Sequence, residues 1–145
     1  MCLITKQKKV EILKEDLTVY KRFTIIDEQI LPWSSEYRHL INYKVGQLHK
    51  QPLNVNKVPR DVFDSIVSKY YNLSCPLKDC KKALKLTHIH EGFHSVIEYD
   101  RLESIHHYLP PLRLDYICII PKGSEVFRDE TGLIVSNQII LKEKI

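Results

Sequence analysis

Glycine is scarce in this sequence, with only 4 in 145 residues, and no apolar run is long. The low glycine content excludes collagen-like and glycine-rich low-complexity chains. No stretch approaches the roughly 18 consecutive apolar residues of a transmembrane helix. The first residues also lack the apolar stretch of a secretory signal. We therefore expect a cytoplasmic protein that has no membrane partner.

Cysteine is sparse as well, with 4 in the chain. Cys118 lies inside the apolar run of residues 116–120, where a buried thiol behaves as a small hydrophobic side chain. This placement favours a reduced, intracellular protein, because disulfides persist mainly in oxidising compartments.

Common enzyme motifs are absent. The sequence holds no G-x-S-x-G, G-x-x-x-x-G-K-S/T, G-x-G-x-x-G or H-E-x-x-H pattern. The net charge is a mild +4, from 22 Lys and Arg against 18 Asp and Glu. Proteins that bind duplex nucleic acid usually carry a more basic, clustered surface, so we expect no such partner. A small anionic ligand is compatible with this charge.

What the chain does contain is the composition of a folded domain. Hydrophobic residues make up 43% and charged residues 28%, both near the averages of globular proteins. A chain of 145 residues corresponds to one domain, and we predict a single domain over residues 1–145. Residues 1–16 are expected to form an arm or a short edge strand, and residues 50–80 a long irregular or helical insertion.

The residue patterns predict an α+β fold. Runs rich in β-branched and aromatic residues predict strands, and apolar residues spaced three or four apart predict helices. Strands are expected at 17–26, 37–43, 114–120 and 132–141, and helices at 61–70 and 98–109. We predict a twisted, mainly antiparallel sheet with two or three short helices. Residues 116–120, apolar without alternation, should form a central strand that is covered on both faces.

Histidines and cysteines gather in one part of the chain and suggest a metal site. His88, His90 and His94 would share one face of a strand, and Cys75 and Cys80 lie just upstream. Imidazole and thiolate are ligands that zinc prefers. However, the two cysteines are spaced more widely than the usual C-x-x-C pair, and a glycine interrupts the strand. We therefore predict histidines with ordinary hydrogen bonds and no metal.

The N-terminal residues offer one further reactive group. Removal of Met1 would leave Cys2 with a free amino group beside its thiol, as in N-terminal nucleophile enzymes. Those enzymes need a large layered fold, and Cys2 is followed here by Leu-Ile. The favoured alternative is that residues 2–4 form an apolar anchor that packs on the sheet.

Four blocks of the sequence carry a resemblance to known proteins. The blocks are Val19-Tyr20-Lys21, Gly92-Phe93-His94-Ser95, Cys118-Ile119-Ile120-Pro121-Lys122-Gly123-Ser124 and Ser136-Asn137-Gln138-Ile139-Ile140-Leu141. Together with the Met-Cys-Leu start, they resemble a family of small uncharacterised proteins of phages and bacteria. The resemblance covers most of the chain apart from residues 50–85. It implies a phage or prophage protein and no known activity.

The order of the blocks is also distantly similar to the ADP-ribosyltransferase fold. That likeness places Lys21 and Arg22 on the first strand and residues 92–95 at a nicotinamide pocket. It places Gln138 where those enzymes carry a catalytic Glu. A neutral amide can bond a ribose hydroxyl, but it supplies no negative charge to the cation that develops as nicotinamide leaves. The likeness therefore implies a binding protein rather than a transferase.

A ligand site follows from the same blocks. Tyr20, Arg22, Phe93, His94 and Gln138 are predicted to converge on one small anionic ligand of the nucleotide kind. Arg22 is preferred to its neighbour because Tyr20 shares its strand face. No catalytic residue, cofactor or metal is assigned.

The predicted role is a small non-enzymatic binding or inhibitory protein that acts on a host nucleotide signal or a host protein. Two alternatives stay open. One is a divergent ADP-ribosyltransferase-like enzyme, and the other is a structural or interaction module with no ligand pocket. The oligomeric state is also left open.

Overall fold

The computed structural model describes residues 3–32, 42–59, 85–89, 91–105 and 113–145, and these residues form mainly β-strands. They contain twelve strands and one helix: β1 (Leu3–Thr5), β2 (Glu11–Ile12), β3 (Leu17–Ile26), β4 (Gln29–Pro32), β5 (Leu48–Lys50), β6 (Val55–Pro59), β7 (Lys85–Ile89), β8 (Phe93–Val96), α2 (Arg101–Ile105), β9 (Arg113–Ile120), β10 (Glu125–Arg128), β11 (Leu133–Ser136) and β12 (Gln138–Lys144).

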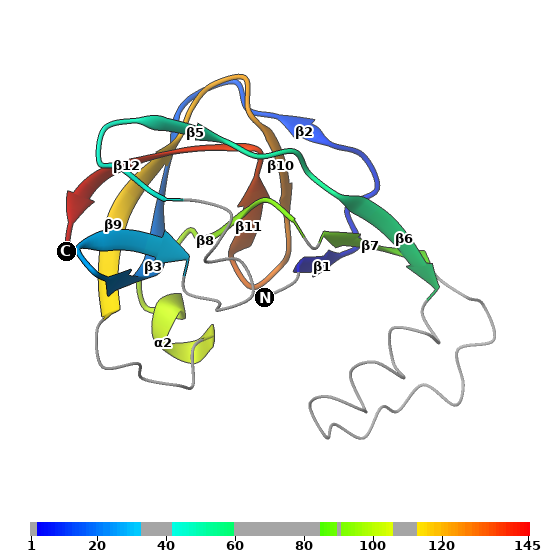
Figure 1. Ribbon diagram of the computed structural model, residues 1–145. Helices are drawn as coiled ribbons and strands as arrows, with labels where there is room; N and C mark the ends of the chain where they lie inside the picture. The colour runs from blue at the N-terminus through cyan, green and yellow to red at the C-terminus, as the bar shows by residue number, and fades with distance from the viewer. Residues whose placement is uncertain (1–2, 33–41, 60–84, 90, 106–112) are drawn as a thin grey trace.

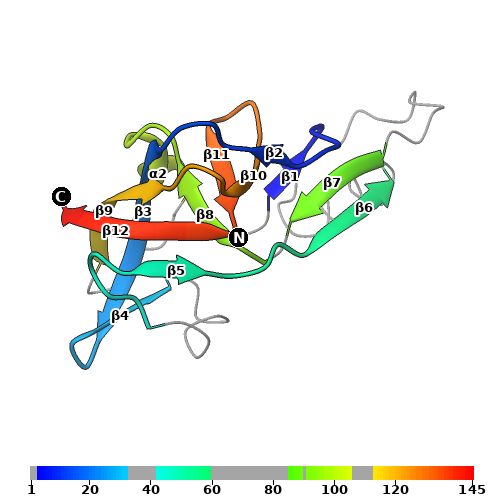
Figure 2. The ribbon, with the colours of Figure 1, turned by 90° about the horizontal axis from the view of Figure 1, so that it is seen from above.

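Nine strands form one antiparallel sheet in the order β2-β10-β11-β8-β3-β9-β12-β5, with β4 paired to β3. Asn137 alone separates β11 from β12 in the chain, although β8, β3 and β9 lie between them in the sheet. The sheet must therefore curl back on itself, and Figures 1 and 2 show this curved arrangement. We call the face inside the curl the interior face and the opposite face the outer face.

The interior face holds the larger core. Side chains alternate along a strand, so Val19 and Phe23 of β3 point inward together with Tyr116, Cys118 and Ile120 of β9. Burying an apolar side chain of this size contributes on the order of 1.5–3 kcal/mol, so this core fixes β3 against β9. The remaining buried members are Leu13, Tyr43, Phe93, Val126, Ile134, Ile139 and Leu141.

A second core lies on the outer face of β8, β10 and β11. A small sheet with the order β1-β7-β6 covers this face, and Figure 1 shows β6 and β7 extending away from the main sheet. Leu3 pairs with Ile89 and is fully buried there, whereas Cys2 lies outside the described residues. The members of this core are Leu3, Ile89, Val96, Leu102, Phe127, Leu133 and Val135.

The predicted mainly antiparallel sheet is confirmed, but the described fold is closer to all-β than to α+β. Of the helix predicted at 98–109, α2 covers only Arg101–Ile105, and residues 106–109 lie outside the described part, as does the helix predicted at 61–70. Several strands that the patterns missed are two to five residues long. Such short strands depend on pairing with distant segments, so local patterns indicate them poorly.

The two longest strands follow the sequence patterns closely. β3 has the predicted bounds 17–26, and β9 lies between β3 and β12, as expected of a central strand. Cys118 is fully buried, whereas Ile117 and Ile119 are half-buried, so the outer face of β9 is less covered than predicted. The single strand predicted at 132–141 is instead two strands, because the chain turns at Asn137.

Two residues with left-handed backbone close the hairpin between β3 and β4. Asp27 has φ 51° and Glu28 has φ 64°. Two-residue hairpin turns with positive φ usually contain glycine, because a side chain in this conformation costs about 1–2 kcal/mol. The pairing of β3 with β4 therefore maintains two residues in a backbone conformation that is locally unfavourable.

The predicted insertion at residues 50–80 is only partly visible. Within it, β6 pairs with β7 along five register positions, so its first part is a strand rather than an irregular segment. Residues 60–84 lie outside the described part, as do most residues of the strand predicted at 37–43.

Candidate functional site

β3 carries two adjacent cations, and strand alternation sends them to opposite faces of the sheet. Arg22 lies on the outer face, directly opposite Asp115 of β9. Lys21 lies on the interior face, between Val19 and Phe23 along the strand. The surroundings of these two side chains differ sharply.

Arg22 is fully occupied by neighbouring acceptors. Its Nε donates to Asp115 Oδ1 at 2.7 Å and its Nη2 to Asp115 Oδ2 at 3.0 Å. Nη2 also donates to Glu103 Oε1 at 2.9 Å, and Nη1 lies 3.5 Å from the carbonyl of Leu102. The side chain is 1% exposed. Paired, two-point contacts of this kind are the strongest arrangement available to an arginine, so the guanidinium serves to fix α2 on the sheet.

The carboxylate of Asp115 is matched to this cation. Burial alone would raise its pKa, but the hydrogen bonds and charge of Arg22 outweigh burial and lower the pKa. The hydroxyl of Tyr99 also donates to Asp115 Oδ2 at 3.2 Å. The hydrogen bond with Asp115 is in turn the main cause that raises the pKa of Arg22. Arg113 Nη1 lies 3.3 Å from Glu103 Oε1, so two guanidinium groups balance the two carboxylates of this network at neutral pH.

Lys21 has no comparable partner. Its Nζ donates to the backbone carbonyl of His94 at 2.6 Å and lies 5.6 Å from the ring centre of Phe23. Within the described residues, no ion pair joins this ammonium to a carboxylate. Burial lowers the pKa of Lys21 to about 8, and the neighbouring Cys118 opposes that shift. The interior face thus holds a cation that no carboxylate of the described residues neutralises.

The hydroxyl of Ser95 lies on the same interior face as Lys21. Tyr20 pairs with Val96 between β3 and β8, and continuing this antiparallel register sets Lys21 opposite Ser95. Ser95 is 2% exposed, and its Oγ has no hydrogen-bond partner within the described part of the chain. A buried hydroxyl without a partner costs about 1–3 kcal/mol. An unmatched cation and an unmatched hydroxyl therefore lie on adjacent strands.

His94 contributes its backbone to this site, and its ring is neutral. Ring Nδ1 lies 3.2 Å from the carbonyl of Gly92, and Nε2 lies 3.4 Å from that of Ile89. Burial, helped by the charge of Lys21, lowers the pKa of His94 to about 3. A neutral imidazole has one N–H, so it donates to only one of the two carbonyls. His94 is therefore not a second cation for an anionic ligand.

The predicted ligand residues do not meet at one place. Phe93 points into the interior core and is fully buried. Tyr20 lies on the outer face, with its ring centre 5.8 Å from that of Tyr99. Arg22 and His94 also belong to the outer face, but the Arg22 guanidinium is enclosed by carboxylates.

Gln138 lies at the Phe93 end of β8, because Ser136, two residues earlier, pairs with Phe93, and its hydroxyl donates to the Gln138 carbonyl at 2.9 Å. Its level along β12 differs from that of Arg22 on β3. Ile140 is level with Ile119, which is level with Thr18, so Gln138 is six residues from the level of Arg22. At about 3.3 Å per residue this is roughly 20 Å along the strands, and two strand spacings across add about 10 Å. The structure therefore places Gln138 close to Phe93 and six residue levels from Arg22 by the register of β9 and β12.

The predicted metal ligands are only partly described. Cys75, Cys80 and His90 lie outside the described residues, so the prediction about metal at this cluster stays a prediction. Among the residues that are described, no three His, Cys, Asp or Glu side chains could hold a metal ion together.

Sequence reasoning missed three members of this region: Ser95 as an orphaned hydroxyl, Asp115 as the partner of Arg22, and Tyr99 as a donor to it. The alternation of β3 could have indicated that one cation faces the core. No local signal could have identified Asp115, because it lies 93 positions from Arg22 in the chain.

Comparisons with protein-family models, with curated proteins and with solved structures give no match to this chain. In the described residues, no helix is long and apolar enough to cross a membrane.

Proposed function

We propose that this protein is a small non-enzymatic binding protein that holds an anionic ligand, of the phosphate or nucleotide kind, at Lys21. The observation that carries the proposal is an ammonium on the interior face that no carboxylate of the described chain neutralises. A lysine ammonium has three donors, and one of them is used by the His94 carbonyl. The other two, with the Ser95 hydroxyl, suit the oxygens of a phosphate.

The energetics favour a functional role for Lys21. Burial of an uncompensated charge destabilises a fold, and a strongly lowered pKa beside a specific set of polar groups is typical of functional sites. A bound anion would restore the charge balance through charge-assisted hydrogen bonds. The same anion would raise the pKa of Lys21, so we expect binding to weaken above the pKa of about 8.

The biological setting follows from the sequence resemblance. A phage or prophage protein that sequesters a host nucleotide signal would need binding and no chemistry. The transferase alternative is less favoured, because Gln138 carries no charge and the Arg22 guanidinium is already bound by Asp115 and Glu103.

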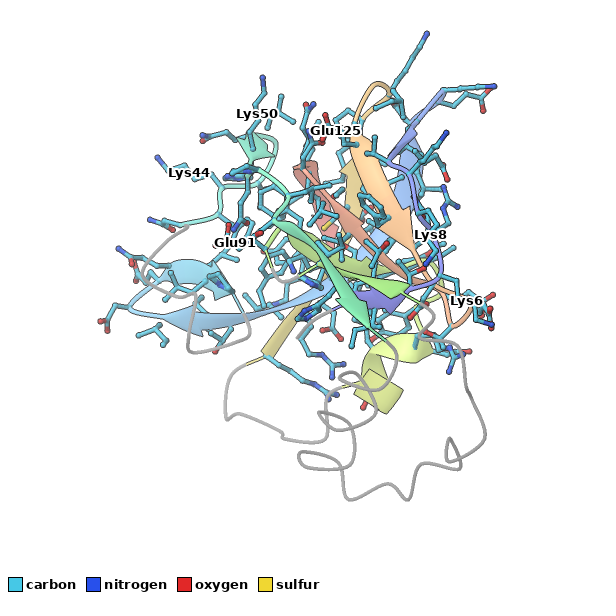
Figure 3. The ribbon with its side chains drawn as sticks, turned by 90° about the vertical axis from the view of Figure 1, so that its right-hand side faces the viewer. Lys6, Lys8, Lys44, Lys50, Glu91 and Glu125 are labelled. Atoms are coloured by element: carbon cyan, nitrogen blue, oxygen red, sulfur yellow. The ribbon has the colours of Figure 1, made fainter. Side chains whose placement is uncertain are left out.

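Isothermal titration calorimetry with inorganic phosphate, NAD, ADP-ribose and cyclic dinucleotides tests the proposal. We expect saturable binding of one of these to the wild type and loss of at least tenfold in affinity for Lys21→Met. Ser95→Ala should weaken binding to a smaller extent. Lys44→Met is the matched control, since this exposed lysine projects from the surface in Figure 3. Equal binding by Lys21→Met and the wild type, or no binding across the panel, would contradict the proposal.

A further inference from the structure

An apolar row crosses the outer face of the sheet. Thr18 of β3 pairs with Ile119 of β9, Ile119 with Ile140 of β12, and Ile140 with Leu48 of β5. The neighbours of these residues along each strand, such as Cys118 and Ile139, point into the interior core, so the row itself faces outward.

The row is open to solvent on the described molecule. Leu48 is 39% exposed, Thr18 is exposed, and Ile119 and Ile140 are half-buried. The helix α2 covers the outer face only at the level of Arg22, two rows of side chains away. An in-register row of three aliphatic residues on β9, β12 and β5, extended by Thr18 on β3, is more than the scattered apolar residues of an ordinary surface.

Two opposite charges flank the row on its two sides. Lys50 pairs with Gln138, one row toward the start of β12, and Glu143 pairs with Ile117, one row toward its end. Both charged residues are exposed, and neither takes part in an ion pair within the described residues. In Figure 3, Lys50 projects away from the body of the protein.

We propose that this outer face binds a second copy of the chain about a two-fold axis, with Lys50 of each copy against Glu143 of the other. The face is self-complementary in charge, which is what an isologous contact requires. A contact with an unrelated acidic or basic partner would leave one of the two flanking charges opposed to a like charge.

The register of the sheet supports this geometry. Lys50 and Glu143 lie on adjacent strands and two rows apart, about 5 Å across and about 13 Å along the strands. The two-fold axis that places Lys50 of one copy on Glu143 of the other lies in the plane of the contact and bisects the line between these two residues at a right angle. Because that line runs about 13 Å along the strands and about 5 Å across them, the axis lies within about 20° of the apolar row. The row of one copy therefore packs on the row of the other. The strands then cross at about 40°, close to the roughly 30° of aligned sheet packing.

Charge reversal tests the contact with sedimentation velocity and light scattering on the full chain. We expect a dimer for the wild type, a monomer for Lys50→Glu, and a monomer for Glu143→Lys, since each variant opposes like charges at both ends of the contact. The double variant Lys50→Glu/Glu143→Lys should dimerise again. An equimolar mixture of the two single variants should form a heterodimer, because each supplies the charge that the other needs.

Lys9→Glu, a charge reversal at an exposed lysine beside β2, at the opposite end of the strand order from β5, is the control and should remain dimeric. Circular dichroism of each variant confirms that loss of the dimer is not loss of the fold. A wild type that stays monomeric at every concentration overturns the proposal. A dimer that both single variants retain, or single variants that fail to associate when mixed, overturns it equally and leaves the row for a different protein.

Discussion

Arg22 and Lys21 are neighbours on the same strand, yet the two faces of the sheet treat their charges in opposite ways. The outer face surrounds Arg22 with two carboxylates, one of them in two-point contact. The interior face offers Lys21 one backbone carbonyl and an aromatic ring. Because side chains alternate along β3, two adjacent residues carry one cation that is paired within the fold and one that is not.

The pKa values of Arg22 and Lys21 are shifted in opposite directions. The hydrogen bond with Asp115 raises the pKa of Arg22, whereas burial lowers that of Lys21 to about 8. A buried charge that is compensated resists removal, and one that is uncompensated destabilises the fold that contains it. The comparison therefore predicts that removing the Arg22 charge lowers the free energy of unfolding and that removing the Lys21 charge raises it.

The largest effect is expected for Arg22→Met. This variant leaves Asp115, which is 9% exposed, without its cation, and breaking a buried pair in this way costs about 3–5 kcal/mol. Urea unfolding at pH 7 measures the loss. The double variant Arg22→Met/Asp115→Leu should recover most of it, because an apolar pair of similar volume needs no compensation. A loss below about 1 kcal/mol for the single variant would place the network among exposed ion pairs.

The second prediction concerns pH. The folded pKa of Lys21, about 8, lies below its ordinary value of 10.5, so its contribution to stability is fully present above pH 10.5 and is lost as the pH falls through 8. The free energy of unfolding of the wild type, relative to Lys21→Met, should therefore rise between pH 8 and pH 10.5. A shift of this size corresponds to about 3 kcal/mol.

Measuring against Lys21→Met is essential here. Burial raises the pKa of Cys118 to about 12 and also raises that of Tyr43, so both groups destabilise the folded state as alkaline pH ionises them in the unfolded chain. The contribution of Tyr43 cancels in the difference, and that of Cys118 cancels except for its charge interaction with Lys21, which only the wild type contains. A difference that stays flat across this range would mean that the Lys21 ammonium is solvated.

A smaller effect of opposite sign to that of Arg22→Met is expected for Lys21→Met at pH 7. The variant removes the unfavourable burial of charge but leaves the His94 carbonyl without its donor, which costs about 1–3 kcal/mol. The net result should be a gain of about 1–2 kcal/mol in the free energy of unfolding, because desolvation is the larger of the two contributions. Thermal and urea unfolding both report this gain. Net destabilisation would make Lys21 a structural residue like Arg22.

The sequence predicts that Lys21 and Arg22 lie on opposite faces of a strand, but it does not predict which face holds the carboxylates. The ten residues of β3 contain no Gly or Pro and are rich in β-branched and aromatic types, so the strand and the alternation of its two cations were accessible. Which face holds the carboxylates depends on the pairing of Arg22 with Asp115 and on the position of α2, and both are non-local. The preference for Arg22 as the ligand cation relied on Tyr20 alone, and Tyr20 carries no information about charge compensation.

The same reason explains the errors in the fold. β4, β5 and β10 are three or four residues long and are defined by their partners, so no local periodicity indicates them. The turn at Asn137 divides a segment whose apolar content is continuous, and the division follows from the curl of the sheet. Residues 138–141 could be assigned to a strand, but the position of that strand in the sheet, between β9 and β5, could not be derived from local patterns.

The smallest predicted effect supplies a background in which the comparison can be repeated. Glu28 has φ 64° in the hairpin that ends β3, and glycine adopts this conformation without strain. Glu28→Gly should therefore stabilise the protein by about 0.5–1 kcal/mol, after the greater flexibility of glycine in the unfolded chain is subtracted. Because the turn lies more than about 10 Å from both cations along the strand, the gain should add to the effects of Lys21→Met and Arg22→Met. Urea unfolding of the three single variants and the two doubles checks this. A gain that disappears when Arg22 is replaced would show that the hairpin depends on the ion network for its register, and the contrast between the two cations would then extend to the whole strand.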